Sequence, residues 1–272
     1  MTEHPGGSTT PRPSEPGWAG DLAVERRGPV AVVTMLDDSR LNAQRRTFWA
    51  SLREVLHDLE GDDSVRAVVI TGDGQRAFSA GGDIHGYVEL RSVPDRRDFI
   101  VDCMRTFEAV ETFGKPVIAA VNGLALGGGS ELALACDVIL ASETASFGVP
   151  ESGLGLVPGF GVLRLIDHVS PGWAKYLVFT GERLDAETAE RLGIVQKVVA
   201  SESLLDEAVG LGERMATAAP MALRTGKAVL NSALNTRYLS SVDAIVMLQS
   251  TEDAAEGIAA FQERRRPEFH GR

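Results

Sequence analysis

A run of three glycines followed by a glutamate stands where a predicted strand leads towards a predicted helix. Gly127-Gly128-Gly129 lies between the apolar run 117–121 and the Leu- and Ala-rich run 131–136. Glycine lets another group approach the bare backbone, and the first N–H groups of a helix have no internal partner and lie at its electropositive end. The stretch therefore has the parts of a site for an anion or a developing oxyanion, with the carboxylate of Glu131 beside it. The alternative is that the glycines only permit close packing and that Glu131 only offsets the helix dipole.

Two further segments offer matching chemistry. The turn Ala80-Gly81-Gly82-Asp83 can expose a bare N–H group, and an oxyanion hole needs two such donors that converge. Pro150 fixes its own backbone and restricts Val149, so Glu151 is presented on a stiffened chain. Two carboxylates in a partly desolvated cleft can divide the roles of acid and base between them. Taken singly, the turn is typical of an ordinary loop and Glu151 of a surface residue.

Other catalytic and cofactor signatures are weaker. Gly72, Gly74 and Ala77 match a dinucleotide fingerprint after a predicted strand, but the FSAGGDIHG that follows is too glycine-rich and polar to open a helix. The five histidines are scattered without ligand spacing, so we expect no metal site. The sequence has no serine-nucleophile elbow. The run Arg264-Arg265-Arg266 is typical either of a solvated helix end or of a set of phosphate contacts.

The composition limits the partners of the chain. Its 272 residues are 44% hydrophobic, which is enough for one large core, and its formal net charge is −11. Such a charge attracts neither nucleic acid nor an anionic membrane, and no apolar run is long enough to cross a bilayer. Residues 1–20 lack a secretory h-region and are predicted to form a disordered tail. Two cysteines without C-x-x-C spacing indicate a reducing compartment, so we expect a cytoplasmic protein without a zinc site or a disulfide framework.

Hydrophobic patterning places these segments in an alternation of strands and helices. We expect strands at 22–27, 30–36, 66–71, 117–121, 138–141, 145–149 and 194–199. We expect helices at 44–60, 96–113, 131–136, 171–180 and 185–192, and then successive helices over 203–265. The alternation indicates an α/β fold with a helical C-terminal extension that packs on its own core or on a neighbouring subunit.

Several motifs follow one another in a fixed order along the chain. They are Leu41-Asn42-Ala43, AFSAGGDI, KPVIAAVNGLALGGGSELALACD, FGVPESGLGLVPG, GERLDAETAERLGIVQKVV and EGIAAFQERRRPEF. Together they resemble the crotonase superfamily, the enoyl-CoA hydratase/isomerase family, over about residues 21–272. The resemblance implies a crotonase-like spiral of ββα repeats over 21–202 and a helical C-terminal trimerisation region over 203–272. It also implies a homotrimer or a homohexamer built from two trimers.

The resemblance implies roles for particular residues. Gly82 and Gly128 would donate the two N–H groups of an oxyanion hole to a thioester carbonyl. Glu131 would act as the base on a water that attacks Cβ, and Glu151 would deliver a proton to Cα. Gly159 would help to hold the water. The implied enzyme is a trans-2-enoyl-CoA hydratase, with dehydration as its reverse reaction, and it needs no cofactor beyond the coenzyme A of its substrate.

The substrate-binding positions are implied in the same way. They comprise two segments that hold the bent coenzyme A and one basic position that reaches its phosphates: Leu41, Asn42, Ala43, Ala80, Asp83, Ile84 and Arg264. The chain reads GVPE and PGFGVLRL where familiar short-chain hydratases read close to GQPE and PGAGGTQRL. Phe160 thus replaces a small residue and is expected to narrow or reshape the acyl pocket. PGFGVLRL resembles the corresponding segment of carnitinyl-CoA dehydratase-like members.

Several alternatives stay open on sequence alone. Within the superfamily they are a double-bond isomerase, a carnitinyl-CoA dehydratase-like enzyme and a thioester hydrolase. Isomerases often keep only one of the two acids, and this chain has both. Outside the superfamily there are two alternatives. One is a non-catalytic scaffold or binding protein, since some relatives bind RNA, and the other is a nicotinamide dehydrogenase. The net charge of −11 argues against RNA binding.

Overall fold

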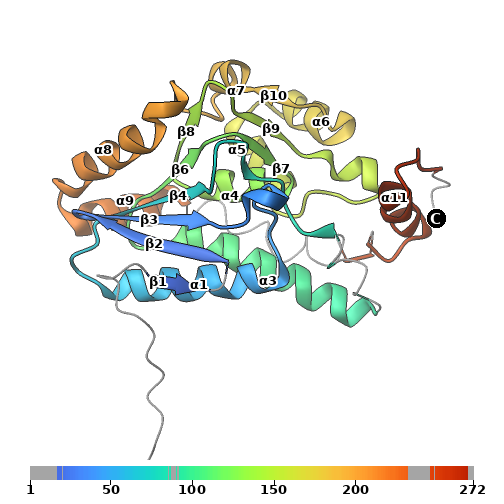
Figure 1. The fold of residues 1–272 in the computed structure, drawn as a ribbon, viewed down its shortest axis with the longest axis horizontal. Helices are drawn as coiled ribbons and strands as arrows, with labels where there is room; N and C mark the ends of the chain where they lie inside the picture. The colour runs from blue at the N-terminus through green and yellow to red at the C-terminus, as the bar shows by residue number, and fades with distance from the viewer. Residues whose placement is uncertain are drawn as a thin grey trace, which may run out of the picture.

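Two β-sheets form the centre of the molecule (Figure 1). The computed structural model describes residues 17–19, 21–84, 86, 90, 92–231, 246–247 and 249–268. Across the larger sheet the strands run in the order β1 (Gly17–Ala19), β2 (Leu22–Arg27), β3 (Val30–Met35), β4 (Ala67–Gly72), β6 (Val117–Val121), β8 (Val138–Ser142) and β11 (Lys197–Val199). The smaller sheet has the order β10 (Leu184–Asp185), β9 (Ser146–Gly148), β7 (Leu124–Leu126) and β5 (Ala77–Ser79).

Helices surround both sheets. The longer ones are α1 (Arg46–Gly61), α3 (Val93–Thr112), α4 (Gly128–Ala135), α5 (Gly161–His168), α6 (Pro171–Thr180), α7 (Ala186–Leu192), α8 (Leu204–Ala216), α9 (Pro220–Asn231) and α11 (Glu252–Gln262). The part of the chain that the structure describes also contains three short 3-10 helices, η1 (Asp38–Arg40), η2 (Pro150–Leu154) and η3 (Ser201–Ser203). Side-chain caps mark the N-termini of two helices. Ser92 forms a capping box at the start of α3, and the Asp185 side chain accepts a hydrogen bond from the N–H of Thr188 at the start of α7. No helix among the described residues is long and apolar enough to span a membrane.

The central strands of the larger sheet are apolar on both faces because both faces are covered. Every residue of β4 and of β6 is buried, and β3, β4, β6 and β8 pair in parallel. Val68 and Ile70 face the main core with α1 and α3, whereas the alternate residues Ala67 and Val69 face a second core under α8. Figure 1 shows α1 and α3 along one side of the sheet and α8 on the other.

The chain repeats one supersecondary unit three times. A strand of the larger sheet passes into a strand of the smaller sheet and then into a helix: β4–β5–α3, β6–β7–α4, and β8–β9 followed by η2 and α5. Within the smaller sheet, β7 pairs in parallel with both β5 and β9. The α/β fold and its spiral of ββα repeats are confirmed.

The predicted elements have counterparts, with some corrections. No strand was expected at Ala77–Ser79 or at Leu124–Leu126, yet these segments form β5 and β7, since three-residue strands carry no readable alternation. The expected strand 194–199 is shorter, Lys197–Val199. The expected disordered tail 1–20 is wrong at Gly17–Ala19, where backbone pairing with β2 forms β1. Residues 1–16 and 20 of that tail lie outside the described residues, as do 232–245 and 248 of the expected helical region.

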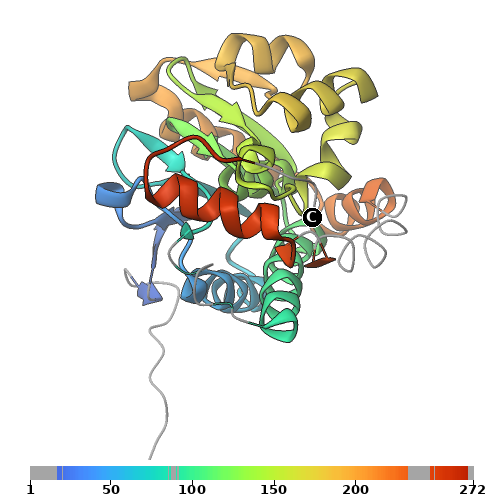
Figure 2. The same ribbon diagram turned by 90° about the vertical axis from the view of Figure 1, so that its right-hand side faces the viewer.

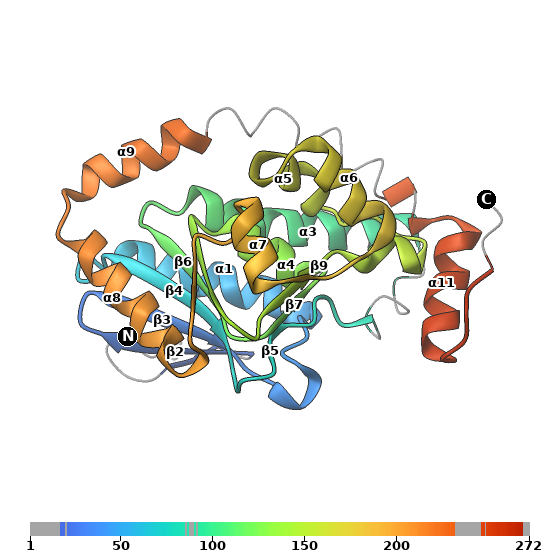
Figure 3. The same ribbon diagram turned by 90° about the horizontal axis from the view of Figure 1, so that it is seen from above.

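Helix α11 lies across one end of the molecule, on the opposite end from α9 (Figures 2 and 3). It packs on η2 with backbone against backbone. A Cβ at Gly257 of α11 would lie 2.3 Å from the carbonyl carbon of Leu154 in η2. From the other side, a Cβ at Gly155 would lie 2.5 Å from the carbonyl oxygen of Asp253. Glycine at both positions therefore permits this close contact.

We expect Gly257→Ala to push α11 away from η2, because the added methyl group has no room against the backbone of Leu154. The free energy of unfolding should fall by about 1–3 kcal/mol, as is usual for overpacking, and the C-terminal segment should become more sensitive to protease. Gly210→Ala in α8 is the matched control, since a Cβ there would meet only Nη1 of the Arg214 side chain, at 3.8 Å. It should leave stability unchanged or raise it by about 0.5–1 kcal/mol. Equal melting temperatures for the two variants would contradict the tight packing.

Candidate active site

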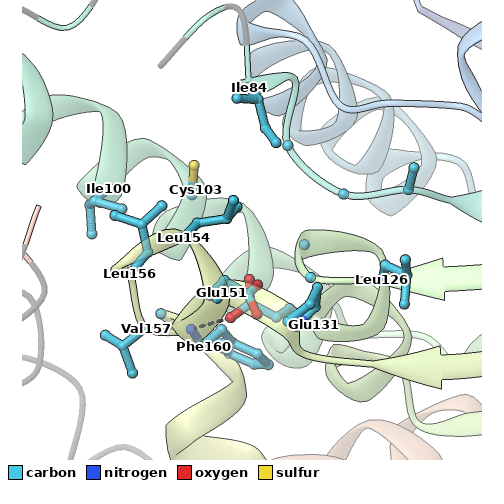
Figure 4. A pocket seen from close by; sticks show the side chains of 18 of the residues that line it. Ile84, Ile100, Cys103, Leu126, Glu131, Glu151, Leu154, Leu156, Val157 and Phe160 are labelled. Carbon is cyan, nitrogen blue, oxygen red and sulfur yellow. Dashed lines mark hydrogen bonds between the residues drawn. The ribbon is translucent and has the colours of Figure 1, made fainter. Parts of the chain in front are cut away.

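A cavity of about 490 Å³ lies where the glycine loops, η2 and α11 meet. Figure 4 shows Glu131, Glu151 and several of the apolar side chains that line it. Its walls come from α1, α3, the start of α4, η2 and α11. Among the described lining residues, the charged side chains are those of Glu131, Glu151 and Arg183. Almost all the other side chains that line it are apolar, so the two carboxylates stand in a mostly apolar space.

The pairing of β5 with β7 brings the two glycine loops together. Each of these parallel strands ends in one of the loops, 80–83 after β5 and 127–129 after β7, and neighbouring parallel strands end at the same edge of a sheet. Gly81 has a φ of 92°, and a Cβ there would lie 2.6 Å from the carbonyl oxygen of Leu126 and 3.1 Å from the nitrogen of Gly128. The backbones are thus closer than side chains would permit.

Two backbone N–H groups are left for a ligand at this point. A Cβ at Gly128 would lie 3.4 Å from the nitrogen of Gly82, which places the two glycines side by side at the cavity. Among the described residues, neither N–H group donates a hydrogen bond. The carbonyl of Gly127 accepts from the N–H of Glu131, so the adjoining Gly128 N–H points away from the helix that follows. Two neighbouring free N–H groups at one cavity can serve as the donors of an oxyanion hole.

Glu131 stands in the first turn of α4 and is 7% exposed. Its Oε1 accepts hydrogen bonds of 2.7 Å from the N–H groups of both Phe160 and Gly161, at the start of α5. Burial raises the pKa of this carboxyl to about 7, against the lowering effect of the two N–H donors. Burial alone would favour the neutral carboxylic acid of Glu131. The two N–H groups at the electropositive start of α5 favour its carboxylate form instead.

Glu151, in η2, lies beside Glu131 at the same cavity (Figure 4). Its Oε2 is buried without a hydrogen-bond partner among the described residues. Burial, and after it the negative charge of Glu131, raise the pKa of Glu151 to about 8. Two backbone N–H groups donate to Oε1 of Glu131, whereas Oε2 of Glu151 has no partner among the described residues, so the negative charge is favoured at Glu131. This arrangement provides a base and an acid in one space.

Gly127 makes room for the second carboxylate. It has a φ of 51°, and a Cβ there would lie 2.8 Å from Oε1 of Glu151. The glycine triplet thus does two things, since Gly128 presents an N–H group and Gly127 admits an acid.

Most of the predicted site residues line the same cavity: Leu41, Ala80, Gly82, Ile84, Gly128, Glu131, Glu151, Gly159 and Phe160. Asn42, Ala43, Asp83 and Arg264 do not line it. The Asn42 side chain is buried and donates to the carbonyl oxygens of Asp73 and Ala77, so it supports the neighbouring loop. Arg264 is exposed, three residues beyond the cavity-lining Phe261. The assignment of these positions to coenzyme A stays a prediction.

Phe160 forms part of the wall, as expected from its size. Its side chain is fully buried, and its ring lies 4.8 Å from that of Phe107. The guanidinium of Arg164 lies 5.1 Å from the centre of the same ring and forms a buried ion pair with Glu111, with Nη2 2.7 Å from Oε2. Phe160 is therefore held rigidly, and the same residue supplies one of the N–H groups that bind Glu131.

Sequence analysis did not identify two groups that the structure places here. One is the face of α3 that lines the cavity with Ile100, Cys103 and Met104, which its helical periodicity signals as buried without saying against what. The other is Gln44, whose side chain donates to the carbonyl oxygen of Gly128. A polar residue directly after Leu41-Asn42-Ala43, at the start of an amphipathic helix, was the available signal.

Of the described residues, no group of three or more His, Cys, Asp or Glu side chains is arranged to hold a metal ion.

The raised pKa of Glu151 makes a prediction about stability. Folding favours its protonated form, so its contribution is fully present below the ordinary pKa of 4.5 and is lost as the pH rises through about 8. Glu151→Gln cannot be charged, and we expect its melting temperature to exceed that of the wild type above pH 8 and to approach it at pH 5. Glu207→Gln, at an exposed ion pair with Lys197, should show no gain at high pH. A gain for Glu151→Gln that is equal at pH 5 and pH 9 would contradict a raised pKa.

Comparison with known proteins agrees with this geometry. The sequence profile of the family described as enoyl-CoA hydratase/isomerase matches residues 25–272. A short-chain-enoyl-CoA hydratase of Clostridium acetobutylicum is 38% identical, covering 91% of this chain and 97% of that protein. A crotonyl-CoA hydratase of Syntrophomonas wolfei is 37% identical, covering 92% and 97%. The solved structure of a carnitinyl-CoA hydratase from Mycobacterium avium matches with a TM-score of 0.83 at 35% identity, covering 93% and 99%. The chain belongs to the enoyl-CoA hydratase/isomerase family.

Proposed function

We propose that this protein is an enoyl-CoA hydratase, which adds water to a trans-2-enoyl-CoA thioester or removes it in the reverse direction. The observation that carries the proposal is that two free N–H groups, of Gly82 and Gly128, lie at the same cavity as two buried carboxyl groups, of which only Glu131 is bound by two N–H groups of another helix. Relatives that are 37–38% identical carry the names short-chain-enoyl-CoA hydratase and crotonyl-CoA hydratase. No cofactor is required, because the coenzyme A of the substrate activates the acyl group as a thioester.

The reaction divides among four residues. The thioester carbonyl accepts hydrogen bonds from the N–H groups of Gly82 and Gly128, which stabilise the enolate-like charge that develops during addition. A donor of this kind typically contributes about 3 kcal/mol to the transition state. Glu131 takes a proton from water as the water oxygen bonds to Cβ, and Glu151 gives its proton to Cα. The two carboxyls then exchange their proton states before the next turnover.

The substrate's two parts meet different surroundings. The mostly apolar lining favours an apolar acyl group, and Phe160 with Phe107 limits its width. We assign Gly159 to holding the attacking water. We assign the coenzyme A moiety to the segments 41–43 and 80–84, which lie partly in the cavity wall, and to Arg264 outside the cavity. The exposed guanidinium of Arg264 suits a phosphate group.

We further propose that the protein is a cytoplasmic homotrimer or a dimer of trimers. No residue of α9 is buried, and Met221 and Leu230 on it are exposed by 68% and 78%. Tyr176 and Phe179 of α6 are exposed as well, by 47% and 73%. Apolar surface of this extent on helices suits contact with further copies of the chain. On this proposal residues 203–272 form the oligomerisation region, after the core of 21–202.

The proposal predicts a direct spectroscopic result. Mixing the protein with crotonyl-CoA and with longer and branched trans-2-enoyl-CoAs should bleach the ultraviolet band of the conjugated thioester, and mass spectrometry should find the 3-hydroxyacyl-CoA. Carnitinyl-CoA and 3-enoyl-CoA in the same panel test the dehydratase and isomerase alternatives. Conversion of either of these without hydration of any 2-enoyl-CoA would overturn the assignment.

The two carboxyls predict a bell-shaped pH profile of kcat/KM. Activity should fall as the pH drops through about 7, because Glu131 becomes protonated, and fall again as it rises through about 8, because Glu151 loses its proton. Glu131→Gln and Glu151→Gln should each lower kcat by at least about 100-fold with KM nearly unchanged, as expected for general acid–base groups. Near-normal kcat in both variants would exclude the two-acid mechanism.

A further inference from the structure

Gln44 joins the two glycine loops, although it does not line the cavity itself. It directly follows the segment Leu41-Asn42-Ala43 and is 2% exposed. Its backbone contacts one loop and its side chain contacts the other. A single buried residue therefore links the chain segments that carry the two free N–H groups.

The backbone of Gln44 brackets Gly82. Its N–H donates to the carbonyl oxygen of Gly81 at 2.8 Å, and its carbonyl oxygen accepts from the N–H of Asp83 at 3.0 Å. These two bonds form an isolated parallel bridge between Gln44 and Gly82. In a parallel bridge of this kind the bracketed residue turns its own N–H away, so the N–H of Gly82 is left free.

The side chain of Gln44 lies against Gly128. Its Nε2 donates to the carbonyl oxygen of Gly128 at 3.1 Å, and a Cβ at Gly128 would lie 2.4 Å from its Oε1. The carbonyl oxygen of Gly128 can only accept a hydrogen bond, so it fixes which end of the amide faces it. This leaves Oε1 buried without a partner among the described residues. Leaving a buried acceptor unpaired is unfavourable, and only Nε2 of this amide is used.

We propose that Gln44 is a positioning residue that sets the separation and direction of the two N–H donors of Gly82 and Gly128. The inference rests on the proposed oxyanion hole of a thioester enzyme. Oxyanion donors act through preorganised geometry, and a displacement of about 1 Å can cost about 100-fold in rate. Without the bond from Nε2, the peptide that follows Gly128 loses its tie to the Gly82 loop, and the two donors no longer hold one fixed spacing.

Two near-isosteric variants remove the donor. Gln44→Leu replaces the amide by an apolar group, and Gln44→Glu places a carboxylate oxygen against the carbonyl oxygen of Gly128. We expect kcat for crotonyl-CoA to fall about 10- to 100-fold in both, with KM changed less than about threefold. A bound 2,4-dienoyl-CoA should also lose most of the red shift of its absorption band, because that shift reports polarisation of the thioester carbonyl by the two N–H groups.

Gln196 provides the matched control. Its amide also ties two backbone segments together, with Oε1 accepting from the N–H of Ile139 and Nε2 donating to the carbonyl oxygens of Gly193 and Ile194, and it does not line the cavity. Gln196→Leu and Gln196→Glu should lower the melting temperature while leaving kcat and the red shift unchanged. Normal kcat and normal red shift in both Gln44 variants, or equal losses in the Gln196 variants, would overturn the proposal.

The readouts separate this inference from the proposed function. A wild-type protein that hydrates no enoyl-CoA refutes the function, whereas its red shift on the bound dienoyl thioester still reports the N–H pair and its dependence on Gln44. If the wild type hydrates crotonyl-CoA and both Gln44 variants do so at the same rate, only the positioning role of Gln44 is refuted. If Gln44→Leu fails to fold, the result is taken from Gln44→Glu, which keeps the size of the side chain and its Oε1 but loses the Nε2 donor.

Discussion

The site depends on two stretches of backbone that lie closer together than residues with side chains could. Parallel pairing of β5 and β7 brings the loops to one edge of the small sheet, and the absence of a Cβ at Gly81 and Gly128 lets them meet. The cavity, the free N–H groups and the place of Glu151 beside Gly127 all follow from this approach. A methyl group on these glycines would clash within the protein itself. At Gly81 it would meet the facing loop, at Gly128 the side chain of Gln44, and at Gly127 the side chain of Glu151.

A second constraint is electrostatic. Burying two carboxyls beside each other raises both pKa values, and the fold compensates one of them with the N–H groups at the start of α5. Stability is thereby given up at the place where function needs an acid and a base of different strength. The asymmetry comes from backbone donors and not from a neighbouring cation, so it does not depend on the ionisation of a third side chain.

Sequence reasoning went furthest where the signal was long or ordered. The strands 117–121 and 22–27, the amphipathic helices and the glycine loops could be read from periodicity and glycine placement, and the order of motifs led to the family. The strands β5 and β7 were not predicted, because three residues are too few to show a periodicity. Yet it is the pairing of these two strands that brings the two glycine loops together. The role of Gln44 could not be predicted either, since its bond to Gly128 links residues 84 positions apart. Glu131 was found as a candidate, but its partner α5 was not, because nothing local in the chain marks a backbone N–H that binds a distant side chain.

The packing of α11 on η2 has a consequence for biosynthesis. Leu41, near the start of the folded chain, and Phe261, near its end, line one cavity. Domains fold from the N-terminus while the ribosome is still adding residues, so the sheets and the glycine loops can form before α11 has been made. Until then the cavity lacks the part of its wall that Ile258 and Phe261 supply. The last helix among the described residues therefore completes the wall of the cavity, after the segments that carry both acids have been made.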